Sequence, residues 1–261
     1  MVRRQDSWID DERFRQGNNK TRRGADNPSD PDVHGPKAKK ARKYTGIKQK
    51  TKALLLRYYV SPLSAIRDVQ AFRNDDELCD PKAKDYILAA LDDFGKDVND
   101  YSLRQLYEML STSDAEPKFI ASMVYGTLED SVVWIDDLLK FQFHDDSELI
   151  TRFLNSVVDV VDKKIPKLNC LTMHAPPSSG KNFFFDMIMA ICLNYGQLGQ
   201  ANRNNVFAFQ EAPNKRILLW NEPNYEAALT DTIKMMMGGD PYNVRVKNQA
   251  DLHVRRTPII V

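Results

Sequence analysis

The sequence predicts an α/β fold with a parallel sheet in residues 143–261, preceded by a helical region over residues 53–142 and a disordered basic tail over residues 1–52. Three observations predict this order. After residue 166, short apolar runs alternate with helical patterns, which is typical of a parallel α/β sheet. Between residues 53 and 142, apolar residues recur at helical spacing. The first 52 residues hold 15 basic and 7 acidic side chains and few aliphatic ones.

The N-terminal tail buries too little apolar surface to offset the conformational entropy of the chain, so residues 1–52 are expected to be disordered. Within it, residues 37–43 read Lys-Ala-Lys-Lys-Ala-Arg-Lys. Such a basic run indicates a nuclear localisation signal or a DNA-contact patch. It predicts a location in the nucleus, which is the host cell nucleus if the protein is viral. A solvated linker is the alternative, because short basic runs are common.

Several classes of protein are disfavoured. The longest apolar stretch, Phe183–Leu193, has 11 residues and contains Asp186, so it is too short to span a bilayer and no membrane partner is expected. The N-terminus lacks the apolar segment of a secretory signal. Three cysteines without CxxC spacing disfavour a disulfide framework and a zinc finger.

The helical region shows its period most clearly at Leu103, Leu106, Tyr107 and Leu110, which fall at i, i+3, i+4 and i+7 and form one face of a helix. A core-facing helical bundle is predicted over residues 53–142. No residue in this region indicates chemistry by itself.

The C-terminal region begins with a helix predicted over residues 147–165, because Pro166 cannot continue it. Gly238 is expected to cap the last helix. The segments after Pro166 are expected to be strand, helix, strand, helix and strand, at residues 168–173, 183–193, 216–220, 227–237 and 258–261.

The strongest functional signal lies between the first of these strands and its helix, in the segment Ala175-Pro176-Pro177-Ser178-Ser179-Gly180-Lys181-Asn182. This is the context of a P-loop, in which backbone N–H groups and the positive end of a helix surround phosphate oxygens. Gly180 would let the backbone approach closely, Lys181 would lie between the β- and γ-phosphates of ATP, and Asn182 would offer an oxygen to Mg²⁺. Two positions depart from the general pattern, since Ala175 stands where glycine is usual and Asn182 where Ser or Thr is usual. A Ser/Gly turn that caps a helix is the alternative.

A carboxylate follows the second predicted strand. The run Ile217–Trp220 leads into Asn221 and Glu222, and the carboxyl end of such a strand lies at the ligand-binding edge of an α/β sheet. An apolar strand that ends in an acid is the pattern of a Walker B motif. Glu222 could orient or deprotonate an attacking water, and the neutral Asn221 could help to hold a magnesium-bound water. A surface acid after a strand is the alternative.

Four further segments complete a pattern that is specific to one family: Lys167-Leu168-Asn169, Leu219-Trp220-Asn221-Glu222-Pro223-Asn224, Gly238-Gly239-Asp240 and Thr257-Pro258-Ile259-Ile260-Val261. With the phosphate loop, they make residues 167–261 resemble the helicase domain of the parvovirus large non-structural replication protein. That domain is a superfamily 3 helicase of the AAA+ class. The likeness is greatest to the densovirus branch, which carries a similar Gly-Lys-Asn and Trp-Asn-Glu-Pro.

The resemblance implies an AAA+ core that hydrolyses ATP with Mg²⁺ as a homo-oligomeric ring, a hexamer in the family, with the helices of residues 53–142 as its oligomerisation collar. It also implies a β-hairpin, motif B′, over Val244–Val254, which grips single-stranded DNA. Lys247 stands where the lysine of this hairpin is expected, and Arg245 adds positive charge nearby. A lysine at a hairpin tip would contact phosphate without reading base sequence. A solvated basic loop is the alternative.

Two features of the family are not found. Its nickase domain needs a His-x-His pair, and the four histidines form no such pair: His34, His144, His174 and His253. The chain also stops at Val261, on the strand that leads to the sensor 1 asparagine in the family, and the arginine finger would lie farther on. We therefore expect a C-terminally incomplete core, either a fragment or a shortened gene, that hydrolyses ATP poorly by itself.

Three functions remain open at this point. The leading hypothesis is an ATP-dependent DNA helicase module of a viral replication initiator that translocates on single-stranded DNA. The second is a non-enzymatic protein that binds nucleotide and DNA. The third is a P-loop kinase for a small molecule, although no lid or acceptor motif is visible.

Overall fold

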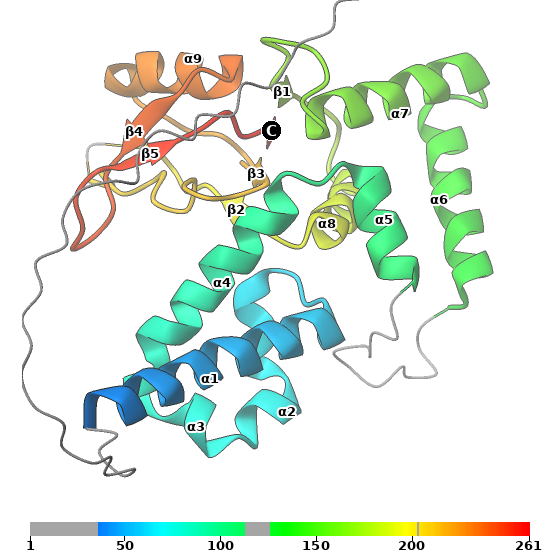
Figure 1. The fold of residues 1–261 in the computed structure, drawn as a ribbon. Helices are drawn as coiled ribbons and strands as arrows, with labels where there is room; N and C mark the ends of the chain where they lie inside the picture. The colour runs from blue at the N-terminus through cyan, green and yellow to red at the C-terminus, as the bar shows by residue number, and fades with distance from the viewer. Residues whose placement is uncertain (1–35, 113–125, 203) are drawn as a thin grey trace, which may run out of the picture.

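The computed structural model describes residues 36–112, 126–202 and 204–261, which fold into a helical region and a sheet region (Figure 1). The helical region begins with the long helix α1 and ends with α5. Its elements are α1 (Pro36–Tyr58), η1 (Leu63–Asp68), α2 (Gln70–Arg73), α3 (Asp76–Cys79), η2 (Pro81–Ala83), α4 (Lys84–Asn99) and α5 (Leu103–Thr112).

The sheet region follows and alternates helices with short strands. Its elements are α6 (Leu128–Gln142), α7 (Ser147–Val161), β1 (Cys170–Leu171), α8 (Lys181–Cys192), β2 (Tyr195–Gln197), β3 (Ile217–Leu219), η3 (Ala227–Leu229), α9 (Thr230–Gly238), β4 (Tyr242–Val244), β5 (Leu252–Val254) and β6 (Ile259–Ile260). The predicted α/β fold, with a parallel sheet after a helical region, is confirmed. None of the helices in the described residues combines the length and apolar character needed to cross a bilayer.

The main sheet has four parallel strands in the order β1-β6-β3-β2. The last strand of the chain, β6, therefore lies between the strand that precedes the phosphate loop and the strand that leads to Glu222. Ile259 pairs in register with both Cys170 and Leu218. Because all four strands run in the same direction, their carboxyl ends meet at one edge of the sheet and their amino ends at the other.

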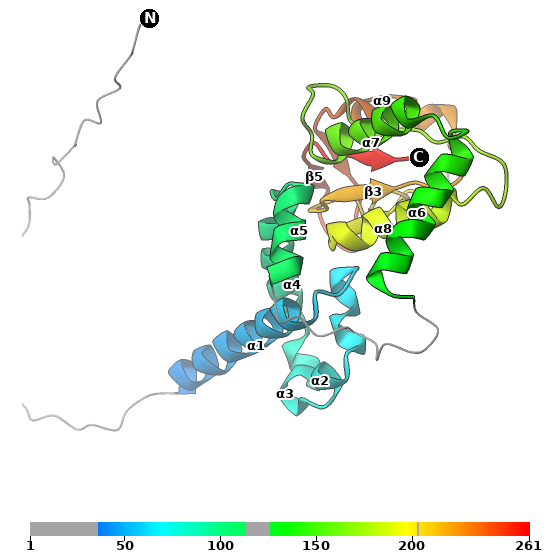
Figure 2. The ribbon, with the colours of Figure 1, turned by 90° about the vertical axis from the view of Figure 1, so that its right-hand side faces the viewer.

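Alternating side chains give the sheet two apolar faces. Ile217 and Ile260 are buried with residues of α7 and α8, among them Val161 and Ile188. On the opposite face, Leu218, Ile259 and Trp220 are buried with residues of α9 and of the hairpin β4–β5, including Met236, Val244 and Val254. The sheet is therefore the middle of three layers, as two views at right angles show (Figures 1 and 2).

Some element boundaries differ from the predicted ones. Helix α7 ends at Val161, before residue 165, and Asp146 caps its start by accepting hydrogen bonds from the amides of Glu148 and Leu149. Helix α9 starts at Thr230 after a 3₁₀ turn. Its left-handed cap is Gly239 (φ 75°) and not Gly238. The pattern predicts no strand at β2, because Tyr-Gly-Gln is neither apolar nor clearly alternating.

The prediction of disorder over residues 1–52 is wrong for residues 36–52, which lie in α1, whereas residues 1–35 lie outside the described residues. Ile47 is 2% exposed, and Thr51 and Leu55 are fully buried. These three residues are spaced at i, i+4 and i+8, so they form one face of the helix, and that face packs in the core that includes Ile87 and Phe94 of α4. The segment is poor in aliphatics, but its one large aliphatic residue, Ile47, shares a helix face with Thr51 and with Leu55 just beyond the segment.

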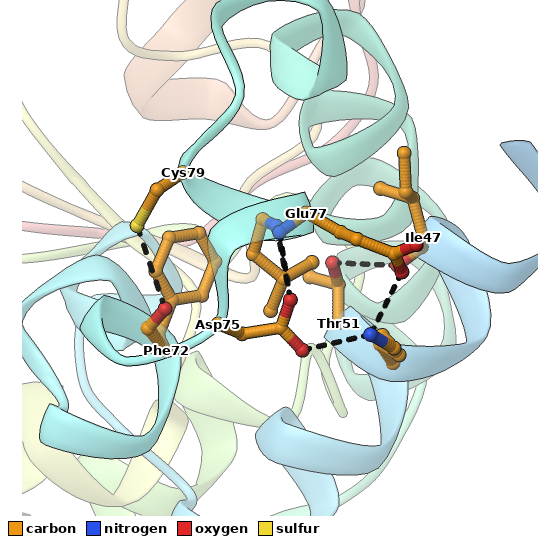
Figure 3. Close-up of polar contacts among 8 residues, drawn as sticks. Ile47, Thr51, Phe72, Asp75, Glu77 and Cys79 are labelled. Atoms are coloured by element: carbon orange, nitrogen blue, oxygen red, sulfur yellow. Dashed lines mark hydrogen bonds and ion pairs between the residues drawn. The ribbon is translucent and has the colours of Figure 1, made fainter. Parts of the chain in front are cut away.

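Polar contacts complete the docking of α1 on the short helices α2 and α3 (Figure 3). The hydroxyl of Thr51 donates to the carbonyl of Ile47 (2.9 Å), which satisfies a buried polar group. Asp75 caps α3 by accepting from the amide of Glu77 (3.0 Å). Lys50 pairs with Asp75 and with Glu77, and this lysine lowers the pKa of the Asp75 carboxyl. These pairs are exposed to solvent, so they contribute little to stability.

Asp162 joins the helical region to the sheet. Its carboxylate accepts from the amide of Leu103 at the start of α5 (2.8 Å) and from the guanidinium of Arg216 just before β3 (3.0 Å). The side chains of Arg216 and Asp162 are only 1% and 9% exposed, and Arg216 also donates to the carbonyl of Val161 (3.1 Å). This buried pair therefore sets the position of the helical region against the amino end of β3.

Replacing Ile47 with alanine is expected to lower the free energy of unfolding by about 2–5 kcal/mol, because it leaves a cavity between α1 and α4. The matched control is Leu56→Ala on the same helix, where the side chain is 52% exposed and the expected change is within about 0.5 kcal/mol. Chemical denaturation followed by circular dichroism measures both changes. Equal, small losses would show that this part of α1 does not belong to the folded core.

Candidate functional site

The segment between β1 and α8 forms a loop that ends in a left-handed glycine. Gly180 has φ 82° and stands directly before Lys181, the first residue of α8. A Cβ on Gly180 would lie 2.7 Å from Cδ1 of Leu138, so helix α6 covers this turn closely. Gln142, also on α6, donates from Nε2 to the carbonyl of Ser179 (2.6 Å). Both the backbone conformation and the packing of α6 therefore require glycine at this position.

The start of α8 can receive an anion. Phe184 donates its amide to the carbonyl of Gly180 (3.1 Å) as the first helical hydrogen bond. The amides of residues 181–183 therefore have no acceptor within the helix. Free N–H groups and the positive end of the helix dipole both favour a negatively charged group here.

A cavity of about 500 Å³ opens at the carboxyl ends of the four parallel strands. Lys181 and Asn182 of α8 line it, and Asn221 and Glu222 line it from the segment after β3. The sequence-predicted residues of the loop and of the acidic motif therefore lie around one space, even though β6 separates the two strands that carry them. Val261, which follows β6, forms part of the wall between them.

The eight predicted loop residues divide between this cavity and a second one. Ala175, Pro177, Lys181 and Asn182 line the first cavity. Ser179 and Gly180 line the second, of about 210 Å³, which Ala175 and Lys181 also border. Pro176 and Ser178 do not line either cavity.

The second cavity lies between the loop and helices α6 and α7. Its walls are mostly apolar, and they include Leu138, Phe143, Phe153 and Phe184. The hydroxyl of Ser179 is buried here and has no hydrogen-bond partner among the described residues. A buried hydroxyl without a partner costs about 1–3 kcal/mol, so an acceptor bound beside the loop would relieve that cost.

Five polar residues of the first cavity escaped the sequence analysis: Thr172, His174, Asp186, Tyr195 and Gln197. Asp186 lies four residues after Asn182, one helical turn along α8, so helical spacing from Asn182 is a signal that could have found it. His174 and Gln197 follow β1 and end β2, and only the parallel order of the strands brings them to the same edge.

The donor set of the first cavity suits a hard cation. Asn182, Asn221, Glu222 and Asp186 offer amide and carboxylate oxygens, which are the ligands that Mg²⁺ prefers. Among the described residues, no group of three or more His, Cys, Asp or Glu side chains is arranged to hold a metal ion. Oxygen donors of this kind would suit a cation that is bound together with phosphate oxygens, which is the usual mode for Mg²⁺.

Glu222 has an unusual backbone for its residue type, with φ 49°. A non-glycine residue in the left-handed region is uncommon and is held there by its surroundings. The neighbouring Trp220 supplies such an anchor, because its amide donates to Ile260 (2.8 Å) and its indole Nε1 donates to the carbonyl of Gly199 (3.1 Å). The carboxylate of Glu222 thus follows a buried, hydrogen-bonded tryptophan.

The predicted hairpin over Val244–Val254 is present as the antiparallel pair β4–β5. Its turn is closed by a hydrogen bond from the amide of Gln249 to the carbonyl of Val246 (3.2 Å), with Asn248 left-handed at φ 61°. Lys247 is exposed in this turn, and the exposed Arg245 precedes it. Neither residue lines the cavity of Lys181 and Glu222, and Figure 1 places the hairpin on the opposite side of the sheet region from α6 and α7.

Comparisons with known proteins agree with this arrangement. Residues 151–261 match the family model described as parvovirus non-structural protein NS1. The chain is 60% identical over 238 residues to the initiator protein NS1 of Diatraea saccharalis densovirus, a match that covers 88% of this chain and 44% of that protein. It is 59% identical over 250 residues to the initiator protein NS1 of Junonia coenia densovirus, covering 92% of this chain and 46% of that protein. The chain thus spans less than half the length of these relatives.

A solved structure of JCV helicase with a bound small molecule shows a similar fold, with a TM-score of 0.51, 12% identity, and coverage of 84% of this chain and 70% of that one. This likeness concerns the fold alone. The resemblance to the parvovirus replication proteins that the sequence predicts is confirmed.

Replacing Gly180 with alanine is expected to lower the free energy of unfolding by about 1–2 kcal/mol from the left-handed backbone alone, and further from the contact with Leu138. The double variant Gly180→Ala/Leu138→Ala removes that contact. It is expected to lose at least about 0.5 kcal/mol less than the sum of the two single losses. Denaturation of the three variants measures this coupling, and strictly additive losses would contradict the contact between α6 and the loop.

Proposed function

This chain is a relative of the parvovirus initiator protein NS1, and from that premise we propose that it is an ATP-dependent DNA helicase module of a viral replication initiator. One observation carries the proposal: Lys181 and Asn182 share a cavity with Asn221 and Glu222 at the carboxyl ends of a parallel sheet. Ligands of α/β sheets bind at this edge. The spacing of the two motifs in the sequence supports this function, and the cavity that they share in the fold supports it independently.

The residues of the cavity have distinct roles in the proposed reaction. The amides at the start of α8 and the ammonium group of Lys181 bind and neutralise the phosphates of ATP. Glu222 orients the attacking water and accepts its proton. Asn182, Asn221 and Asp186 hold Mg²⁺ or its waters, and this cation neutralises charge on the phosphate oxygens. Phosphoryl transfer of this kind depends mainly on positioning and on electrostatic stabilisation.

The second cavity supports binding of the whole nucleotide. Its apolar and aromatic walls adjoin the loop, and Ala175 and Lys181 border both cavities. A purine base is flat and largely apolar, so the space between the loop and α6 suits it. Phosphates in the first cavity and the base in the second would let one ATP molecule contact both sides of the loop.

The hairpin β4–β5 supports the DNA-binding part of the proposal. An exposed lysine at a hydrogen-bonded turn can reach a phosphate without obstruction, and Arg245 adds a second cation on the same loop. In the proposed cycle, ATP hydrolysis moves the hairpin along single-stranded DNA within a homo-oligomeric ring, a hexamer by analogy with the family. The helices of residues 53–142 would form its collar, and the basic run at residues 37–43 would direct the protein to the nucleus.

Lys181→Ala is expected to weaken nucleotide binding about 10-fold or more, because a charged hydrogen bond to phosphate contributes about 1.5–3 kcal/mol. Glu222→Gln is expected to retain nucleotide binding and to lose about 10²-fold or more in the hydrolysis rate. Fluorescent-nucleotide titration measures binding, and phosphate release in the presence of single-stranded DNA measures turnover. Lys140→Gln, an exposed lysine on α6 paired with Asp136, serves as the control. Unchanged binding by Lys181→Ala would overturn the proposal, and binding without any turnover in the unaltered chain would favour the non-enzymatic alternative.

Lys247→Ala is expected to weaken binding of single-stranded DNA several-fold and to leave nucleotide binding unchanged. Loss of one phosphate contact should reduce the slope of log affinity against log salt by about 0.7. Fluorescence anisotropy of a labelled oligothymidylate at several salt concentrations measures both effects. Full DNA affinity in this variant would remove the hairpin from the proposed mechanism.

A further inference from the structure

A second polar cavity lies at the opposite edge of the parallel sheet. Its volume is about 390 Å³, and it is lined by residues that precede β3 and β6, by the end of α4, and by the segment that leaves β5. Its walls carry one carboxylate, that of Asp100. They also carry five cationic side chains: Lys96, Lys163, Lys215, Arg255 and Arg256. No residue that lines the cavity of Lys181 and Glu222 also lines this one, because the two cavities lie at opposite ends of the strands.

Several cations of this cavity have no ion-pair partner. In the described part of the chain, Lys163, Lys215 and Arg255 form no ion pair with a carboxylate. Burial lowers the pKa of Lys163, and the guanidinium groups of Arg216, Arg256 and Arg255 lower it further, while Asp100 acts in the opposite direction. Burial also lowers the pKa of Lys215, while the carboxylate of Glu211 acts in the opposite direction. Around Lys163 the guanidinium groups thus outnumber the one carboxylate, and a bound anion would stabilise the charged form of this lysine.

Three of the five cations have structural partners. Lys215 donates to the side-chain oxygen of Asn194 (3.4 Å). Arg256 donates to the carbonyls of Ile165 (2.6 Å) and Leu168 (2.8 Å), so it holds the connection between α7 and β1. Lys96 pairs with Asp92 on its own helix. Arg255, in contrast, is exposed and Lys163 is half-buried, and no hydrogen bond from either side chain is recorded among the described residues. Arg255 and Lys163 are therefore the groups best placed to receive a ligand.

The position of the cavity relates it to the hairpin. Arg255 follows directly after β5, whereas Lys247 lies in the turn that precedes β5. The eight residue-to-residue steps from Lys247 to Arg255 span at most about 28 Å of extended chain. Positive charge is thus present both at the tip and at the base of one hairpin. A short run of nucleotides can cover the distance between the tip and the base.

We propose that this basic cavity binds the phosphodiester backbone of single-stranded nucleic acid, as a second contact point beyond the hairpin tip. This inference rests on the proposed DNA-binding function and extends it to residues outside motif B′. A flexible single strand can bend its phosphates into a concave site, whereas a duplex is stiff over about 150 base pairs and presents its phosphates on a convex surface. The closely spaced cations suit the repeated charge of a nucleic-acid backbone.

The test uses the full chain without nucleotide and a fluorescein-labelled oligothymidylate. The double variant Lys163→Gln/Arg255→Gln is expected to bind this strand about 10-fold or more weakly. Its slope of log affinity against log salt should fall by about 1.4, because two single-strand phosphate contacts are lost. Arg255→Lys, which retains the charge, should restore most of the affinity lost by Arg255→Gln. The control Lys234→Gln removes an exposed lysine on α9, outside this cavity, and should bind normally.

The outcomes separate this inference from the proposed function. If Lys247→Ala weakens binding and the double variant does not, the hairpin function stands and the inference is overturned. If the double variant lost only the binding of duplex DNA, the inference would also be overturned. It would be overturned as well if inorganic phosphate bound in the cavity without any change in DNA affinity. Nucleotide binding and the thermal midpoint of the double variant should match those of the unaltered chain, so weaker DNA binding with both preserved supports the inference.

Discussion

The common direction of the four strands β1, β6, β3 and β2 is the constraint on which both cavities depend. Because the strands are parallel, their carboxyl ends place Lys181, Asn221 and Glu222 around one space. Their amino ends, together with α4, gather the basic residues around another. An antiparallel pair in the same sheet would have divided each group between the two edges. The polarity of the sheet therefore separates the proposed hydrolysis of ATP from the proposed contact with a nucleic-acid backbone.

The buried pair of Arg216 and Asp162 connects these two edges to the helical region. Burying two charges is costly unless additional hydrogen bonds satisfy them. Here the amide of Leu103 and the carbonyl of Val161 supply two of those bonds, although Nε of Arg216 keeps no partner among the described residues. Arg216 leads into β3, and β3 leads to Glu222. The pair thus joins the start of α5 to the strand that precedes this carboxylate.

The residues that sequence reasoning proposed for the first cavity lie in two short motifs with recognisable neighbours. A glycine and a lysine at the start of a helix, and an acid at the end of an apolar strand, are local patterns. The contributions of His174 and Gln197 depend on how separate segments meet, so no local pattern marked them, whereas Asp186 lies one helical turn after Asn182 on α8. The basic cavity is the extreme case, since residues of α4 and of the segments before β3 and β6 meet there only in the folded chain.

The sequence by itself predicted the α/β class, the loop that ends at Gly180 and an acid after an apolar strand, and the resemblance to the parvovirus family implied the hairpin. The sequence did not determine the helical state of residues 36–52, because composition does not show that Ile47 packs, together with Leu55 farther along the same helix, in the core that includes α4. It also did not determine that β6 separates β1 from β3. Strand order and helix docking were decided by the tertiary structure, because their energy comes from burying surfaces that are distant in sequence.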